Sequence, residues 1–304
     1  MSDALVVWQL SDGKRGHERQ VEGLIAALAA RRPLTQHRIA VPGTAWQRVC
    51  AAASGRLAGA AGLPAPHFII GAGRACQWPL LGLRRARGGR SIYLMRPALP
   101  TACFDLCVVP RHDGIAPGAH VMLSEGPLNP MRPGPAPRAA QGLILIGGPS
   151  RHHRFDRASI LDQVRRIVEH APQLAWTLSD SRRTPPDFAS ALAALPGVQH
   201  VRHQTSGEEW LPAALTQAAE VWVSADSAGM LYEALSAGAP LGVIEVAPRR
   251  ADRITAITAD LCARALAVRV ADLAAGAGPT ASAPLDEAGR IADALLARWP
   301  EPRA

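Results

Sequence analysis

The only lysine of the chain, Lys14, lies in a short glycine-containing segment, residues 12–17. This segment follows the apolar run of residues 5–10, which has the pattern of a buried strand, and it precedes a run with helical periodicity. Lysine carries a compact, mobile ammonium that can follow a phosphate or a developing charge, whereas arginine is a rigid fork. Gly13 and Gly16 allow the backbone to turn tightly, and the N-terminus of the following helix favours negative charge. The segment therefore predicts an anion-binding loop.

His17 is a candidate general base in this loop, because the pKa of histidine lies close to working pH. Asp12 would orient the imidazole or act as the base itself, and Lys14 would steady a phosphate or an acceptor charge. The segment is not a P-loop, since Arg15 stands where that motif requires Ser or Thr. The alternative for His17 is a helix cap or an ordinary surface residue.

A second glycine loop follows the apolar strand pattern of residues 143–146 and contains Gly147, Gly148 and Ser150. Successive glycines after a strand favour an anion-binding nest of backbone N–H groups. Two adjacent histidines and an aspartate follow and invite a metal site. Neighbouring residues seldom both bind one ion, however, and no third ligand lies at helical spacing, so we predict no metal.

A third loop, residues 179–185, contains Arg182 and Arg183 beside Thr184. Two arginines among hydroxyl groups at the end of a strand are suited to clamp a phosphate. A solvated turn is the alternative.

A fourth loop begins a helix and contains Ser224, Asp226, Ser227 and Met230, with Glu233 about two turns into the helix. Asp226 or Ser227 suits the N-cap, and the small residues leave room for a ligand at the positive end of the helix. Glu233 would accept hydrogen bonds from a sugar hydroxyl. The alternative is a well-capped helix and nothing more.

Two weaker sites follow strands of the first half. Residues 71–74 contain a GxG, but Cys76 stands where the dinucleotide fingerprint requires a glycine. The pair His112 and Asp113, next to Arg111, is a second acid–base candidate.

Short strand patterns alternate with helical ones through most of the chain, which indicates parallel sheets covered by helices on both faces. Strands are expected at residues 38–41, 68–70, 91–95 and 106–109 in the first half, and at 143–146, 174–178, 198–202, 221–224 and 241–244 in the second. The proline-rich residues 126–141 interrupt the alternation and predict a linker. We therefore expect an N-terminal Rossmann-like domain at 1–125, a second one at 142–280, and a C-terminal helical segment at 281–304.

The composition restricts the partners. The chain has 304 residues, a formal charge of +8 and a pI near 10.2, which favours anionic partners. Only 4% of the residues are aromatic, and no basic run is interleaved with them, so we predict no nucleic acid partner. Five irregularly spaced cysteines suggest reduced thiols and a cytoplasmic protein, and neither a signal peptide nor an apolar run of ~20 residues is evident. Residues 80–83, with the arginines that follow, would rest against an acidic membrane or simply end a helix.

Taken together, the motifs resemble the mitochondrial fission protein family, whose bacterial members are described as glycosyltransferases. The resemblance lies in residues 11–17 with Gln20, 110–114, 126–129 with Asn129, 147–150, 181–185 and 224–230. It implies a GT-B arrangement, in which two Rossmann-like domains face each other across a cleft and the last helix packs back towards the first domain. It further implies a nucleotide-sugar donor in the second domain, with its pyrophosphate at residues 226–230 and Glu233 on the ribose or sugar. The first domain would bind the acceptor and supply the base.

The sequence thus predicts a metal-independent, cofactor-free glycosyltransferase that moves a sugar from a nucleoside diphosphate to a cell-surface glycan or a lipid-linked acceptor. It would be cytoplasmic, with peripheral contact at the inner face of an acidic membrane. One alternative is a non-catalytic scaffold of division or membrane remodelling with an idle nucleotide cleft. Another, a sugar-nucleotide epimerase, is disfavoured because the NAD fingerprint is incomplete and Lys14 alone allows no Tyr-x-x-x-Lys motif.

Overall fold

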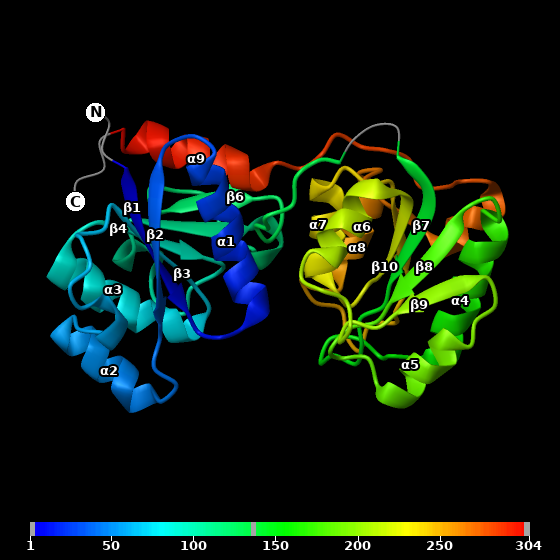
Figure 1. Cartoon of the computed structure of the whole chain (residues 1–304), viewed down its shortest axis with the longest axis horizontal. Helices are drawn as coiled ribbons and strands as arrows, with labels where there is room; N and C mark the ends of the chain where they lie inside the picture. Colours follow the sequence, from blue (N-terminus) through cyan, green and yellow to red (C-terminus); the bar gives the residue numbers. More distant parts are fainter. Residues whose placement is uncertain (1–3, 135–137, 301–304) are drawn as a thin grey trace. The chain divides into compact units, whose positions relative to one another are not determined.

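The computed structural model describes residues 4–134 and 138–300 of the chain. The described residues form two compact units: 4–130 with 286–300 make up unit 1, and those between 131 and 285 make up unit 2. Each unit is built on one sheet of six parallel strands (Figure 1). Helices alternate with the strands in both units, so the predicted fold class of two Rossmann-like α/β domains is confirmed.

Unit 1 has the strand order β2-β1-β3-β4-β5-β6. Its strands are β1 (Leu5–Ser11), β2 (Leu34–Ala40), β3 (Phe68–Ala72), β4 (Arg90–Leu94), β5 (Leu106–Pro110) and β6 (Val121–Ser124). Its helices are α1 (Arg15–Ala29), α2 (Ala45–Ser54), α3 (Gln77–Arg87) and α9 (Glu287–Arg298), with short 3-10 turns η1 (Ala58–Ala60), η2 (Arg74–Cys76), η3 (Thr101–Cys103) and η4 (Arg111–Asp113). The chain leaves β1 towards β2 and then continues on the other side of β1 with β3. The topological switch point, where ligands bind in sheets of this kind, therefore lies between the carboxyl ends of β1 and β3.

Unit 2 has the strand order β12-β11-β10-β7-β8-β9. Its strands are β7 (Ala139–Leu145), β8 (Ala175–Ser179), β9 (Val198–Val201), β10 (Ala218–Ser224), β11 (Leu241–Ile244) and β12 (Val268–Arg269). Its helices are α4 (Arg157–His170), α5 (Pro186–Ala193), α6 (Trp210–Gln217), α7 (Ala228–Ser236) and α8 (Ala256–Ala263), followed by the 3-10 turn η5 (Val270–Ala275). Here the order reverses between β7 and β10, so the switch point lies at their carboxyl ends.

The apolar side of each helix covers the sheet of its own unit. In α1 the buried side chains include Val21, Leu24, Ile25 and Leu28, the residues whose periodicity predicts the helix. The last helix, α9, packs on α1 within unit 1, where Asp293 accepts a hydrogen bond of 2.7 Å from Nη2 of Arg31. This contact ties the C-terminal helix to the element that follows the Lys14 loop.

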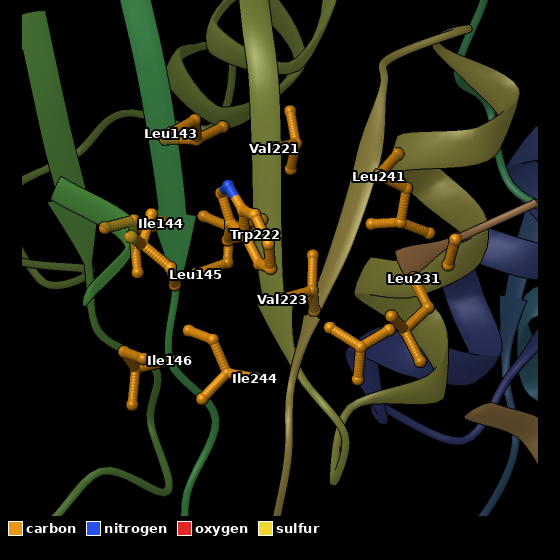
Figure 2. Close-up of a cluster of buried hydrophobic side chains, with 14 of the residues drawn as sticks. Leu143, Ile144, Leu145, Ile146, Val221, Trp222, Val223, Leu231, Leu241 and Ile244 are labelled. Carbon is orange, nitrogen blue, oxygen red and sulfur yellow. The ribbon is translucent and has the colours of Figure 1, made fainter. Parts of the chain in front are cut away.

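The core of unit 2 is formed by residues of the central strands, with Leu143–Ile146, Val221–Val223 and the side chains of β11 and α7 in contact (Figure 2). Two glycines make room for indole rings on neighbouring strands. Gly142 lies opposite Trp176, and Gly242 lies opposite Trp222. A Cβ at either glycine would come within 2.2 Å of a ring atom. Each large ring therefore lies flat against a strand that has no side chain at that point.

Several boundaries differ from the predicted ones. Strand β2 begins at Leu34 rather than at residue 38, because its polar first half pairs with β1 along its whole length. Strand β7 begins at Ala139, within the predicted linker, because residues 139–141 pair with β8 and β10 through their main chain while their side chains remain exposed. Strand β6 was not predicted, and it extends the first sheet at its edge. Linker residues 135–137 lie outside the described residues.

Candidate functional site

The loop after β1 holds the predicted acid–base pair together. Nδ1 of His17 and Oδ2 of Asp12 are 2.9 Å apart, and the Asp12 side chain is 4% exposed while that of His17 is 21% exposed. Gly13 adopts a φ of +74°, which a glycine reaches without strain. A carboxylate accepts hydrogen bonds, so this contact favours the tautomer of His17 that carries its proton on Nδ1. The predicted pairing of His17 with the Asp12 carboxylate is present in the structure.

Lys14 forms the N-cap of α1 with its backbone, and its N–H donates to Oδ1 of Asp12 over 3.2 Å. Its side chain is exposed and makes no ion pair with any residue in the described part of the chain. Gly16, in the first turn, is exposed, and its carbonyl accepts a hydrogen bond from the buried Gln20. The loop thus presents one mobile cation at the start of a helix, beside the Asp12–His17 pair.

Gly73, at the end of β3, is a part of this site that sequence reasoning undervalued. Its φ is +85°, and a Cβ there would lie 2.2 Å from Nδ1 of His17 and 2.9 Å from Oδ2 of Asp12. Gly73 is thus the glycine of the GxG that makes room for the pair, whereas a Cβ at Gly71 would meet Cys76 and Leu80 instead. The signal in the sequence was the glycine itself, at a strand end beside the switch point.

Glu18 and Ser11 are two further buried polar residues beside this loop, of which the matching segment 11–17 contains only Ser11. Ser11 donates to Oε1 of Glu18 over 2.5 Å, and Arg38 forms an ion pair with the same carboxylate. The hydrogen bond from Ser11, helped by Arg38, holds the pKa of Glu18 below its ordinary value. These contacts fix the first turn of α1 against the end of β1.

The other unit 1 candidates do not contact the Asp12–His17 pair in any interaction of the described residues. Asp113 is buried after β5 and accepts the Arg96 N–H over 3.3 Å, while His112 lies beside it with Nε2 3.9 Å from the carboxylate. Arg111 is exposed and pairs with Glu125 over 2.9 Å. The His112–Asp113 neighbours therefore form a separate cluster at another strand end.

Asn129 lies elsewhere again. Its backbone is packed against Gly23, where a Cβ would approach to 2.4 Å, and its side chain reaches the carbonyl of Pro127. Gly23 is roughly two turns into α1 from the Lys14 loop. The contact shows Asn129 fastening the end of unit 1 to α1.

At the switch point of unit 2, the loops after β7 and β10 are joined by direct hydrogen bonds. The Gly147 N–H donates to Oγ of Ser224 over 2.7 Å, and the Gly148 N–H donates to Oδ2 of Asp226 over 3.0 Å. Ser224 in turn donates to Oδ1 of Asp226 over 2.7 Å. A Cβ at Gly147 would lie 2.2 Å from the Asp226 carboxylate. The predicted glycine loop is thus shaped by contact with the fourth loop.

Arg183 completes this cluster, but not as a free phosphate clamp. Its Nη2 is 2.7 Å from Oδ2 of Asp226, and its Nη1 donates to the carbonyl of Gly148 over 2.9 Å. Thr184 also has a structural contact, because its hydroxyl accepts the Ser181 N–H over 2.9 Å and donates to Gly147. Arg182 is exposed, and in the described chain no carboxylate pairs with it. Of the two predicted clamp arginines, only Arg182 has its charge available.

The start of α7 has an open N-terminus. Ser227 is the N-cap residue, yet no side chain of the described chain caps this end. Asp226, the other predicted cap, turns its carboxylate towards Gly148 instead. Met230 is half-buried in the first turn, and a Cβ at Gly229 would meet no described atom within 4 Å. Glu233 is buried further along the helix. The first turn therefore presents free N–H groups beside an open space.

The histidines that follow the glycine loop have individual partners. Nδ1 of His152 is 2.7 Å from Oδ2 of Asp252, a hydrogen bond that lowers the pKa of Asp252, and Asp156 caps α4 through Ser159. His153 is buried, and that burial lowers its pKa. Ser150 uses its hydroxyl to accept the N–H groups of both histidines, at 3.2 and 3.0 Å. Among the described residues, no three His, Cys, Asp or Glu side chains are grouped to hold a metal ion.

A buried carboxylate between two histidines was not predicted. Asp180, after β8, accepts both the N–H and Nδ1–H of His203, at 2.8 and 2.7 Å, and lies 3.2 Å from Nε2 of His200. The cluster fastens the Arg182 loop to the end of β9. In the sequence, the two histidines lie in an apparently ordinary strand end, so nothing marked them.

A pocket of about 570 Å³ lies in unit 2 between α4 and α8, beside the end of β11. His153 and Ala225 line it, together with Gln163, Arg166, Glu245 and Arg269. None of the helices described here combines the length and the apolarity that crossing a bilayer demands.

Solved structures resemble the whole chain in fold. A Listeria monocytogenes protein assigned as a UDP-N-acetylglucosamine 2-epimerase is 13% identical, with a TM-score of 0.56 over 98% of this chain and 97% of that one. Phytolacca americana UGT2, complexed with UDP-2-fluoro-glucose and pterostilbene, is 10% identical, with a TM-score of 0.52 over 97% and 90%. MnaA of S. aureus with UDP is 12% identical, with a TM-score of 0.50 over 98% and 97%. At these identities the likeness shows the fold, which is of the GT-B type.

No curated protein matches the sequence. A family model does match, over residues 15–299, a span that runs from the start of α1 to the end of α9 and includes the loops of both switch points after Lys14. The match covers most of the chain, as did the motifs that suggested the resemblance. The chain therefore belongs to the mitochondrial fission ELM1 family.

Proposed function

We propose that the chain is a glycosyltransferase that uses a nucleoside-diphosphate sugar and transfers the sugar to a cell-surface glycan or a lipid-linked acceptor. The observation that carries the proposal is the open N-terminus of α7 at the switch point of unit 2, beside backbone loops already fixed by Ser224 and Asp226. A helix N-terminus at such a point favours a bound diphosphate. The GT-B type of fold supports the same reading, because similar structures hold UDP and a UDP-sugar.

In this proposal the diphosphate accepts hydrogen bonds from the first N–H groups of α7 and from the Ser227 hydroxyl. Arg182 supplies a positive charge, since its guanidinium is exposed and has no carboxylate partner in the described chain. Glu233 accepts hydrogen bonds from the ribose or the sugar, and Met230 lies against the donor. Gly147, Gly148 and Ser150 shape the adjoining wall.

Asp226 and Arg183 have a different role from the one predicted. A carboxylate next to a diphosphate would repel it, but the Asp226 charge is buried and is matched by Arg183. The pair instead positions the Gly148 loop and the start of α7 for the donor. We therefore propose both as positioning residues, with Thr184 in support.

The acceptor reacts at the unit 1 loop. Nε2 of His17 takes the proton of the acceptor hydroxyl while that oxygen attacks the anomeric carbon of the sugar, and the bond from that carbon to the diphosphate oxygen breaks. Asp12 holds the histidine with Nε2 free and stabilises the imidazolium that forms. Lys14 steadies an anionic group of the acceptor or donor. The departing diphosphate is stabilised by α7 and Arg182, so this route requires neither a metal ion nor a cofactor.

A second candidate is epimerisation of the same nucleotide sugar, favoured by the fold shared with an assigned UDP-N-acetylglucosamine 2-epimerase. The incomplete NAD fingerprint argues against an epimerase that binds NAD through that motif, but not against an epimerase that lacks the motif. The two activities differ in what they need: transfer consumes an acceptor and releases the nucleoside diphosphate, whereas epimerisation changes the sugar without an acceptor. Proton NMR of UDP-sugars incubated with the protein alone separates them.

The deciding experiment measures the melting temperature of the purified chain with a panel of nucleoside diphosphates and their sugars. A ligand at a hundred times its Kd stabilises a folded protein by about 2.7 kcal/mol, a readily measured shift. Arg182→Gln should reduce the shift, and Arg165→Gln, an exposed arginine on α4, is the matched control. If no nucleotide shifts the melting temperature, the non-catalytic scaffold replaces the enzyme. A lipid-linked acceptor would make the chain a peripheral protein at the cytoplasmic face of an acidic membrane.

A further inference from the structure

A long part of unit 1 contains no acidic residue. Between Gly23 and Phe104 the sequence has neither Asp nor Glu, yet it has eleven arginines. They are Arg31, Arg32, Arg38, Arg48, Arg56, Arg74, Arg84, Arg85, Arg87, Arg90 and Arg96. Since the whole chain carries +8, all other residues together carry −3. The positive charge of the protein is therefore concentrated in the stretch that contains α2 and α3.

The same two helices expose large apolar side chains. Trp46 is 74% exposed, and Val49 and Trp78 are each 52% exposed. Between the helices lies a groove of about 420 Å³, lined by Val49, Trp78 and Leu81 with small alanines, and by one charged residue, Arg85. An apolar groove between two helices that also expose indole rings is unusual on a surface that meets only water.

Helices α2 and α3 lie side by side and are packed closely enough to act as one platform (Figure 1). A Cβ at Gly82 of α3 would come within 2.6 Å of the α2 backbone, and one at Gly55 would come within 2.3 Å of Ala86. Each helix follows a strand of the parallel sheet, so both begin at its carboxyl edge. Trp46 and Trp78, each in a first turn, therefore lie at the same end of the platform.

Four exposed residues of α2 form a helical stripe. Trp46, Val49, Cys50 and Ala53 recur at i, i+3, i+4 and i+7, the spacing of one helix face, and all four are exposed. None of these four side chains is charged, whereas the exposed face of an ordinary surface helix carries charged and polar residues. We define the platform surface as this stripe with Trp78, Leu81 and the arginines beside them.

Three arginines on these two helices or in the turn directly before α3 keep their charge available. Arg85 donates to the carbonyl of Ala53 over 2.6 Å, an uncharged partner, and no carboxylate of the described chain pairs with Arg48 or Arg74. Arg84, by contrast, is neutralised by Asp105 at 2.6 Å. The platform surface thus combines an apolar centre with unneutralised guanidinium groups.

We infer that the platform surface binds a bilayer of acidic phospholipids. Indole rings favour the boundary between headgroups and acyl chains, and arginines near an anionic bilayer are attracted to the headgroups. A second copy of the same surface would bring like charge and be repelled. Nucleic acid would satisfy the arginines but offers no apolar cover for Val49 and Leu81. The bilayer fits both features, and it would serve the lipid-linked acceptor of the proposed function.

The experiment mixes the purified full chain with vesicles and measures the fraction that sediments with them. Vesicles of phosphatidylcholine and phosphatidylglycerol in equal amounts should bind the chain at low salt, and those of phosphatidylcholine alone should not. The Trp46→Ser, Trp78→Ser double variant should reduce the partition coefficient roughly tenfold or more, from the apolar area no longer buried. The Trp46→Phe, Trp78→Phe variant should retain most of the binding.

Arginine variants test the charge. Arg74→Gln with Arg85→Gln should lower the partition coefficient about fivefold per residue, and raising the salt concentration should do the same in the wild type. The control with equal charge loss is Arg154→Gln with Arg165→Gln in unit 2, which should bind as the wild type does. Circular dichroism and thermal unfolding confirm that each variant is folded.

Cys50 reports the location without any substitution, because it lies on the exposed stripe. Anionic vesicles should slow its labelling by a maleimide severalfold. The inference would be overturned by any of three results. The chain could bind vesicles while Cys50 stays fully open to labelling, it could bind neutral vesicles equally well, or the Trp46→Ser, Trp78→Ser variant could bind as the wild type does. If the chain bound single-stranded DNA and no vesicles, the ligand of the platform surface would be nucleic acid rather than lipid. The vesicle assays contain no nucleotide sugar, so they do not depend on transferase activity. A chain that binds vesicles but transfers no sugar would refute the proposed function and leave the membrane inference intact.

Discussion

The carboxylate of Asp226 and the guanidinium of Arg183 lie 2.7 Å apart, with the Asp226 side chain fully buried and that of Arg183 41% exposed. They join the ends of β10 and β8, and the same carboxylate accepts the N–H of Gly148 after β7. One buried charge thus holds three of the loops that we propose surround the donor. The loops are in position before any ligand arrives, which favours binding.

Replacing Asp226 by Asn should therefore lower the free energy of unfolding by about 2 kcal/mol. Breaking a buried ion pair costs ~3–5 kcal/mol, and the partial exposure of Arg183 lets water screen part of that loss. Chemical denaturation measures the change. The matched control is Asp187→Asn, which removes an exposed partner of Arg157 and should leave the denaturation midpoint almost unchanged. Equal midpoints for both variants would show that the Asp226 pair is not structural.

Two glycine substitutions should separate stability from ligand binding. At Gly148 a Cβ would lie 2.1 Å from the Arg183 carbonyl oxygen, so Gly148→Ala should destabilise the protein by about 2 kcal/mol. Gly229→Ala has free space and should stabilise α7 by up to ~1 kcal/mol. The same methyl group would intrude on the proposed diphosphate, so nucleotide affinity should fall. Calorimetric titration with UDP checks this, and unchanged affinity would move the diphosphate away from α7.

Asp12→Asn should reduce kcat about a hundredfold or more, because the carboxylate no longer holds His17 in the reactive tautomer. The Kd for the nucleotide should stay the same, since the donor loops belong to unit 2. Glu22→Gln, which removes the partner of Arg15 on the same helix, is the control and should keep full activity. A parallel loss of nucleotide affinity in Asp12→Asn would argue for a structural effect instead.

His153 should make stability depend on pH. Burial lowers its pKa from the usual 6.5, so the folded state binds its proton less readily than the unfolded state does. The resulting stability is fully present above pH 6.5 and is lost as the pH falls from there through the folded pKa. The melting temperature of the wild type should therefore drop between pH 7 and pH 5 by more than that of His153→Gln. Parallel pH profiles would refute the role of His153.

Thiol labelling should follow burial. Burial raises the pKa of Cys76 and of Cys107 to about 12, whereas Cys50 is exposed. Because the thiolate is the reactive form, iodoacetamide at neutral pH should modify Cys50 in the native protein and spare the two buried thiols. Peptide mass spectrometry identifies the modified residues. Early modification of Cys76 would mean that the end of β3 opens readily.

The strand-end loops were predictable because small residues and hydroxyls interrupt apolar runs at regular places. Gly147, Gly148 and Ser224 were chosen on that basis and Asp226 as a candidate helix cap, and the structure joins all four by hydrogen bonds. The Asp12–His17 contact was also predictable, since five residues across a strand-to-helix turn leave the two side chains close.

The partners of individual charges were not predictable from one sequence. Nothing near Arg183 in the chain reveals that Asp226 neutralises it, and the Asp180 cluster depends on strands β8 and β9 being neighbours. The role of Gly73 could be predicted only with the strand order, because β3 follows β2 in the chain but pairs with β1 in the sheet. These contacts depend on which strands are neighbours in the sheet, and the hydrophobic periodicity of a single segment does not indicate its neighbours.

The glycines opposite Trp176 and Trp222 have a consequence for how the family varies. Each indole occupies the space that a side chain on the neighbouring strand would need, with ring atoms 2.2 Å from the position of the missing Cβ. A relative that enlarges the residue at 142 or 242 must shrink the residue at 176 or 222 in the same lineage. Aligned relatives should therefore show reciprocal changes in side-chain volume at these two pairs of positions, a covariation that would report the strand register of unit 2 independently of any structure.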